Sequence, residues 1–143
     1  MKREILFRGK RLDSGGWEYG YPHNGFIGTM IIDPDGIVPD GGEYGYGLDK
    51  YCLVDSATVG QFTGLCDKNG VKIFEGDKLY CEAQLDKAEM YVVFEQGQFR
   101  MVLCDKFKEY ETGRGYYDIN SFQKTVIGNI HDTPELGLEE EAE

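Results

Sequence analysis

The amino-acid sequence predicts a mainly β protein. Aromatic residues make up 13% of the chain and are mostly tyrosine and phenylalanine, which favour half-buried pleated surfaces. Twenty glycines fall between short apolar runs, as in strands that are joined by frequent turns. With 143 residues and 41% hydrophobic content, the chain has the size of one ordinary domain, or of two small modules that share a core.

The N-terminal part is expected to form short strands separated by turns. Alternation places Trp17, Tyr19 and Tyr21 on one face of the second strand. An Asp-Pro-Asp-Gly turn ends the third strand, and a long loop rich in Gly, Pro and Asp follows over residues 36–47. The expected strands cover residues 3–7, 17–21, 26–32 and 51–54.

Residues 59–77 predict a strand, a tight hairpin, a short return strand and a second turn. Asn69 and Gly70 have the chemistry of a hairpin tip, where positive φ angles are required. The alternation that follows predicts that Val71 and Ile73 share a buried face. At the end of this stretch, a Glu-Gly-Asp turn is expected to reverse the chain, with its aspartate accepting a backbone hydrogen bond.

The pattern beyond this turn predicts a meander of short strands. Residues 84–88 are interpreted as a loop rather than one helical turn. A hairpin around residues 96–97 follows, and alternation places Phe99, Met101 and Leu103 on one face. The expected strands cover residues 78–82, 91–95, 98–104 and 125–130.

Three stretches of this chain resemble the YopX family of phage and prophage proteins. They are residues 7–10 with 17–20, residues 59–77, and residues 126–130 with 134–136. The resemblance implies an SH3-like, partly open barrel in the C-terminal half, packed with an N-terminal β module, and it carries no established reaction. We expect a YopX-like domain over residues 1–136, divided into modules of about 1–58 and 59–136, and an acidic tail over 137–143.

The motif residues of this resemblance fall at strand ends. Backbone geometry, rather than side-chain chemistry, sets the residue type at such positions, so we expect these residues to be structural. They are Gly64, Asp67, Asn69, Gly70, Glu75, Gly76, Asp77 and Gly128.

Two pairs of carboxylates are candidates for chemistry. Asp33 and Asp35 are spaced as in some metal loops, but Pro34 lies between them and turn chemistry explains both residues. Glu75 and Asp77 have the spacing of an acid–base pair, although Gly-Asp before a strand is common in structural turns. We favour the structural interpretation for both pairs.

The remaining candidates are a histidine and the cysteines. His131 and Asp132 are neighbours in sequence, which rarely gives the geometry of a general base, and Cys66 at a strand end is expected to pack rather than react. No Cys-x-x-Cys pair or phosphate-binding loop occurs. We therefore predict four reduced, mostly buried thiols and no catalytic residue, cofactor or metal.

The formal net charge of −11 argues against generic binding to nucleic acid or to an anionic membrane. The apolar residues 5–7 are too few for a signal-peptide core, and no run approaches membrane-spanning length. We expect a cytoplasmic protein of the host cell. Five basic residues near the start are expected on a solvated strand edge: Lys2, Arg3, Arg8, Lys10 and Arg11.

These observations favour a non-enzymatic protein that acts through protein contacts as a homo-oligomer, with a host or phage protein as a further partner. The candidate interface residues are Tyr44, Tyr46 and Tyr51, because aromatic side chains are enriched in interface cores. The alternative is a nucleic-acid-linked role in phage replication or host take-over, including that of an acidic decoy of DNA.

Overall fold

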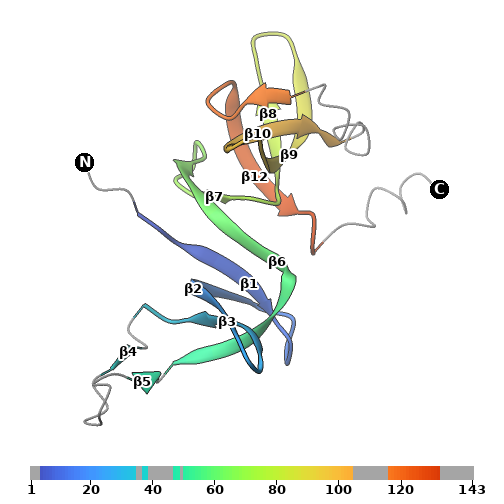
Figure 1. Cartoon of the computed structure of the whole chain (residues 1–143). Coiled ribbons are helices and arrows are strands. Elements are labelled where there is room, and N and C mark those ends of the chain that lie inside the picture. Colours follow the sequence, from blue (N-terminus) through green and yellow to red (C-terminus); the bar gives the residue numbers. More distant parts are fainter. Residues whose placement is uncertain (1–3, 35–36, 39–46, 49, 105–115, 133–143) are drawn as a thin grey trace, which may run out of the picture. The chain divides into compact units, whose positions relative to one another are not determined.

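A computed structural model describes residues 4–34, 37–38, 47–48, 50–104 and 116–132. The chain divides into two compact units, Met1–Phe62 and Thr63–Glu143. Every element of the described residues is a strand (Figure 1), so the predicted mainly β fold class is confirmed.

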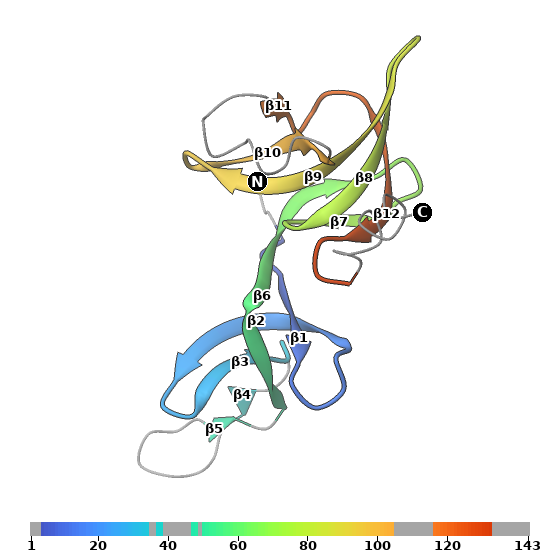
Figure 2. The same cartoon turned by 90° about the vertical axis from the view of Figure 1, so that its right-hand side faces the viewer.

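The first unit contains a closed ring of four strands: β1 (Phe7–Arg11), β2 (Trp17–Gly25), β3 (Gly28–Ile32) and the first part of β6 (Tyr51–Cys66). β1 pairs with β2, β2 with β3 and β3 with β6, and β6 pairs back with β1 (Figures 1 and 2). All four pairings are antiparallel. The buried apolar side chains of this small barrel are Met30, Ile31, Ile32, Val54 and Phe62.

Glycine is required where two strands of this barrel approach closely. A Cβ atom on Gly20 of β2 would lie 2.1 Å from the carbonyl oxygen of Ile32 in β3. No side chain fits that distance, because the obstructing atom belongs to the backbone of the neighbouring strand. The closed barrel therefore depends on this residue type.

Two further short strands, β4 (Ile37–Val38) and β5 (Gly47–Leu48), pair with each other.

The N-terminal strands differ from their predicted bounds. The first strand covers Phe7–Arg11 rather than residues 3–7, because the segment that pairs with β2 and β6 begins at Phe7. The third strand begins at Gly28, since Phe26 and Ile27 form the loop of the β2–β3 hairpin. β6 was expected as two pieces, but it runs unbroken through residues 55–58.

The break expected in β6 is a bulge instead. Between the pairs Arg8–Gly60 and Lys10–Asp55, β1 advances by two residues and β6 by five. The Thr58 hydroxyl donates to the carbonyl of Asp55 and accepts from the backbone N–H of Lys10. The extra residues are thus held by hydrogen bonds, and the strand continues.

The second unit contains a five-stranded sheet. Its strands are β8 (Asp77–Glu82), β9 (Lys87–Glu95), β10 (Gln98–Leu103), β11 (Tyr116–Asp118) and β12 (Gln123–Asn129), in the order β11-β10-β9-β8-β12. A meander whose last strand returns to pair with its first is the strand order of the predicted SH3-like barrel. The short β7 (Lys72–Phe74) precedes β8 and pairs with β6.

The core of this unit is a cluster of six buried side chains: Ile73, Leu79, Cys81, Met90, Val92 and Met101. Phe99 and Leu103 pack against it, as their alternation with Met101 predicted. The expected burial of Val71 was wrong, since this side chain is 48% exposed. The described residues contain no helix that is long and apolar enough to cross a membrane.

Candidate functional site

The structure brings two sequence-predicted candidates together at one end of β8 and β12. Asp77 is the register partner of Asn129, and the backbone N–H of Ile130 donates to the carbonyl of Gly76 over 2.8 Å. The imidazole of His131 lies against the same turn, with Nε2 3.5 Å from the position that a Cβ on Gly76 would take. Residues 75–77 and 129–132 therefore form one cluster, which we call the turn cluster.

The carboxylates of the turn cluster hold backbone in place. Asp77 is 1% exposed, and its Oδ2 accepts a hydrogen bond from the N–H of Phe74 over 2.7 Å. Asp132 Oδ2 accepts from Nδ2 of Asn129, whose Oδ1 in turn accepts from the N–H groups of His131 and Asp132. These are the contacts of an Asx-type turn. Sequence reasoning missed Asn129. The signal for this turn is an Asn whose side-chain oxygen accepts from the N–H groups two and three residues later in the chain, here those of His131 and Asp132.

Asp67 is a second structural carboxylate in the same unit. Its Oδ1 accepts from the N–H groups of Asn69 and Val71 over 2.8 and 2.9 Å, and its Oδ2 accepts from the N–H of Val126 in β12 over 2.9 Å. Burial raises the pKa of this carboxyl. The three backbone donors together lower the pKa by more than burial raises it, so the pKa of Asp67 lies below its ordinary value. Asp67 thus fastens the hairpin between β6 and β7 to β12.

The hairpin beside Asp67 has a different turn from the expected one. Gly70 has a φ of +84°, as predicted, but Asn69 has no positive φ. The N–H of Gly70 donates to the carbonyl of Asp67, and the N–H of Asp67 donates to the carbonyl of Val71. This pattern is a type I turn followed by a glycine bulge, so only one residue needs the left-handed conformation.

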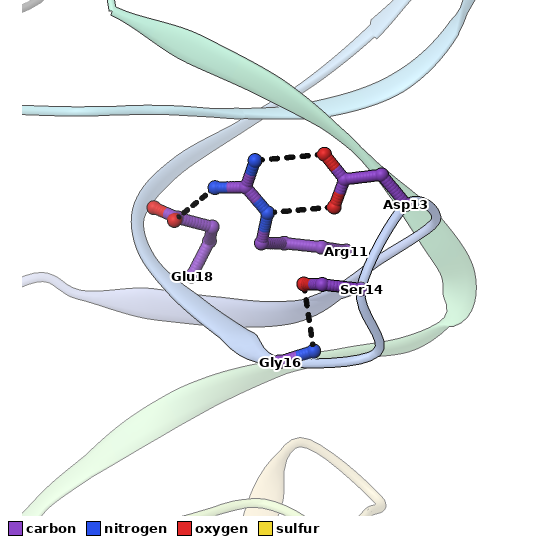
Figure 3. A network of polar contacts seen from close by, with 5 residues as sticks. All are labelled: Arg11, Asp13, Ser14, Gly16 and Glu18. Atoms are coloured by element: carbon purple, nitrogen blue, oxygen red, sulfur yellow. Dashed lines mark hydrogen bonds and ion pairs between the residues drawn. The ribbon is translucent and has the colours of Figure 1, made fainter.

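The first unit carries an ion-pair network at its β1–β2 hairpin. Figure 3 shows the Arg11 guanidinium between two carboxylates: Nε and Nη2 donate to both oxygens of Asp13 over 2.8 Å, and Nη1 donates to Glu18 over 2.6 Å. The hydrogen bonds from Arg11 lower the pKa of Asp13 to about 2, and those to Asp13 and Glu18 raise the pKa of Arg11. In the same turn, the N–H of Gly16 donates to the Ser14 hydroxyl.

The expectation of a solvated basic edge was wrong for Arg8, whereas Lys10 and Arg11 are half-buried. Arg8 is buried, and its guanidinium carbon lies 4.3 Å from the ring centre of Trp17, with Lys10 Nζ 5.7 Å from the same centre. These distances are those of cation–π contacts. Together with the Arg11 network, they turn the basic side chains of β1 toward partners within the chain. Lys2 and Arg3 lie outside the described residues.

Comparison with known proteins places this chain in a family. The family model described as YopX protein matches residues 40–138. The chain belongs to the YopX family. The matched segment includes the motifs at residues 59–77 and 126–130, whereas the N-terminal motifs at residues 7–10 and 17–20 precede it.

One solved structure extends the similarity over almost the whole chain. Protein EF1440 from Enterococcus faecalis is 26% identical, with a TM-score of 0.58, over 94% of this chain and 99% of that chain. No curated protein matches the chain. The YopX assignment and this neighbour thus support the fold and the family but name no reaction.

The thiols of this YopX protein are free cysteines, and the prediction that they are mostly buried was wrong. Cys81 is buried, and burial raises its pKa to about 11. Burial also raises the pKa of the half-buried Cys52, whereas Cys66 is exposed and Cys104 is half-buried. Among the residues that the structure describes, no group of three or more His, Cys, Asp or Glu side chains is arranged to hold a metal ion.

The remaining candidate residues of the sequence are only partly described. Tyr51 begins β6 and is exposed, while Tyr44 and Tyr46 lie outside the described residues. Asp33 is half-buried, and its N–H donates to the carbonyl of Lys50. Its proposed companion Asp35 and the acidic tail at 137–143 are also outside the described residues.

Proposed function

We propose that this YopX protein is a non-enzymatic, phage- or prophage-encoded protein of the host cytoplasm that acts through protein contacts as a homo-oligomer. The observation that carries the proposal is a set of large apolar side chains exposed on the first unit. They are Ile5, Leu12, Tyr19, Tyr21, Phe26, Ile27 and Tyr51. Four of the seven are aromatic, and aromatic side chains are enriched in the cores of protein interfaces.

The turn cluster supports the non-enzymatic part of the proposal. In a catalytic pair, carboxylates would be directed toward a substrate, but Asp77 and Asp132 accept hydrogen bonds from their own chain. Replacing Asp77 would therefore disturb the β7–β8 turn rather than remove a reactive group. Three of the four motif glycines also serve the backbone, since Gly64, Gly70 and Gly76 have positive φ.

The test is the mass of the full chain in solution at low and at high salt. Subunits with a net charge of −11 repel one another, and added salt screens this repulsion, so association should strengthen with salt. Sedimentation equilibrium at micromolar concentration measures it. A mass that stays at 16.2 kDa under both conditions would disprove the homo-oligomer.

The alternative is a nucleic-acid-linked role as an acidic decoy of DNA, and the net charge is the observation that favours it. Salt separates the two proposals. A complex between an acidic decoy and a basic DNA-binding protein weakens as salt is added, whereas self-association of acidic subunits strengthens. Binding of this chain to a DNA-binding protein, competed by duplex DNA and lost at high salt, would favour the decoy.

A further inference from the structure

The β2–β3 hairpin of the first unit ends in two apolar residues that the fold does not use. Gly25 and Gly28 form the last register pair, so Phe26 and Ile27 are the two loop residues. Phe26 is fully exposed and Ile27 is 63% exposed. Neither side chain contributes to the core, and we call this pair the hairpin tip.

Turn chemistry does not explain the hairpin tip either. Two-residue hairpin loops favour Asn, Asp and Gly, because the usual turns place one or both residues at positive φ. Phe26 and Ile27 have no positive φ, and the positive φ of this turn falls on Gly28. Large apolar residues at such a position reduce solubility without stabilising the turn. Proteins break such local rules most often at functional or strained sites.

The hairpin holds its tip in a fixed position. β2 and β3 pair without interruption from Tyr21–Ile32 to Gly25–Gly28. Next to the tip, the Thr29 hydroxyl donates to Oδ1 of Asn24 over 2.8 Å. An ordered tip loses little conformational entropy when it is buried in a contact, which favours association.

The charge distribution decides between partners. From Tyr19 to Ile32 the sequence has no Asp, Glu, Lys or Arg, although the chain as a whole carries −11. A loop that enters an anionic membrane is usually flanked by basic residues, and this hairpin has none. Two acidic copies repel each other least where they carry no charge, so this neutral hairpin is a surface at which a second copy can approach.

We infer that the hairpin tip is a contact by which one copy of the chain binds a second, with Phe26 and Ile27 of both copies packed together around a two-fold axis. The inference rests on the proposed homo-oligomer and names its surface. The two side chains of the tip would bury roughly 300 Å² of accessible surface per copy, whereas a stable interface buries about 800 Å² per partner. The exposed Tyr21 and His23 of β2 extend the neutral contact surface beyond the tip.

The experiment compares three full-length chains by sedimentation equilibrium at high salt: wild type, Phe26→Ser with Ile27→Ser, and Leu85→Ser. Leu85 is a matched control because it is 96% exposed on the turn between β8 and β9, so its replacement removes a similar apolar group elsewhere. The double variant should weaken association by at least about tenfold, while Leu85→Ser leaves it unchanged. Circular dichroism checks that each variant is folded.

A second measurement locates the contact. Hydrogen exchange of residues 24–29 in the wild type should slow as protein concentration rises, and the double variant should lose this dependence. If wild type is monomeric at every salt concentration, the homo-oligomer and this inference fail together. If wild type associates and the double variant associates equally, or Leu85→Ser weakens association as much, only this inference fails. Sedimentation of wild type, but not of the double variant, with phosphatidylcholine vesicles would also overturn it.

Discussion

The carboxylate of Asp67 joins two segments that are 59 residues apart in sequence. Both of its oxygens accept backbone N–H groups, so an asparagine, with one oxygen and one amide group, leaves a donor unsatisfied. We expect Asp67→Asn to lower the free energy of unfolding by about 1–3 kcal/mol, measured by urea denaturation. The control is Asp118→Asn, an exposed carboxylate that accepts one hydrogen bond, from Asn120. A cost equal to that of the control would contradict the role of Asp67.

The lowered pKa of Asp67 makes this contribution depend on pH. A carboxyl whose folded pKa lies below its unfolded value of 3.8 stabilises the fold above that value, and the contribution is lost as pH falls through the folded pKa. The difference in unfolding free energy between wild type and Asp67→Asn should be constant near neutral pH and shrink below about pH 4. Urea denaturation at several pH values measures it, and a difference that grows toward acid would have the wrong sign.

Gly20 makes a close approach that no side chain permits. Its Cβ would lie 2.1 Å from the carbonyl oxygen of Ile32, so Gly20→Ala must push β2 and β3 apart. We expect a loss of at least about 3 kcal/mol or failure to fold. Gly16→Ala is the control, because the nearest atom to its added Cβ is the Ser14 hydroxyl oxygen at 3.4 Å and its φ is not positive. Equal thermal midpoints for the two variants would contradict the close approach.

At the level of elements, the sequence predicted turns better than strand bounds. Turns depend on two or three adjacent residues, so the hairpin at Gln96 and Gly97, with φ of 52° and 79°, was recognisable. Strand bounds depend on the partner. β1 was placed too early because residues 5–7 are apolar, whereas the strand begins at Phe7, where β2 and β6 provide hydrogen bonds. The same holds for the bulge in β6, which depends on contacts with Lys10.

The hairpin between β6 and β7 allows backbone strain to be separated from packing. Gly70 has a φ of +84°, and a Cβ there would meet no atom within 4 Å. Gly70→Val should therefore cost about 1–2 kcal/mol through strain alone. Gly70→Asn should cost less, since asparagine tolerates the left-handed region better. Chemical denaturation of both variants tests this, and a valine variant as stable as wild type would exclude the strained turn.

At the level of the whole molecule, the features that the sequence did not reveal are contacts between distant segments. Closure of the first unit depends on pairs such as Phe7 with Gln61, and no local pattern encodes them. The turn cluster has the same origin: its Glu-Gly-Asp turn and its His131 were recognised separately, but the pairing of Asp77 with Asn129 that unites them was not. Which side chains form a site therefore became visible only with the topology.

The two units have separate cores, and this leads to a prediction about unfolding. The cluster around Leu79 consists of residues of the second unit, whereas the chain has one tryptophan, Trp17, in the first. Leu79→Ala should destabilise the second unit by about 2–5 kcal/mol. It should shift the urea midpoint seen by circular dichroism while leaving that of Trp17 fluorescence nearly unchanged.

Ile31→Ala, in the core of the first unit, is the matched variant and should instead shift the fluorescence midpoint. The reason is that Ile31 and Leu79 are buried residues of different units. If Leu79→Ala moves both midpoints equally, β6 couples the two units into one cooperative structure, because this strand pairs with β1 and β3 of the first unit and with β7 of the second. The two variants together thus decide whether the chain unfolds in one transition or in two.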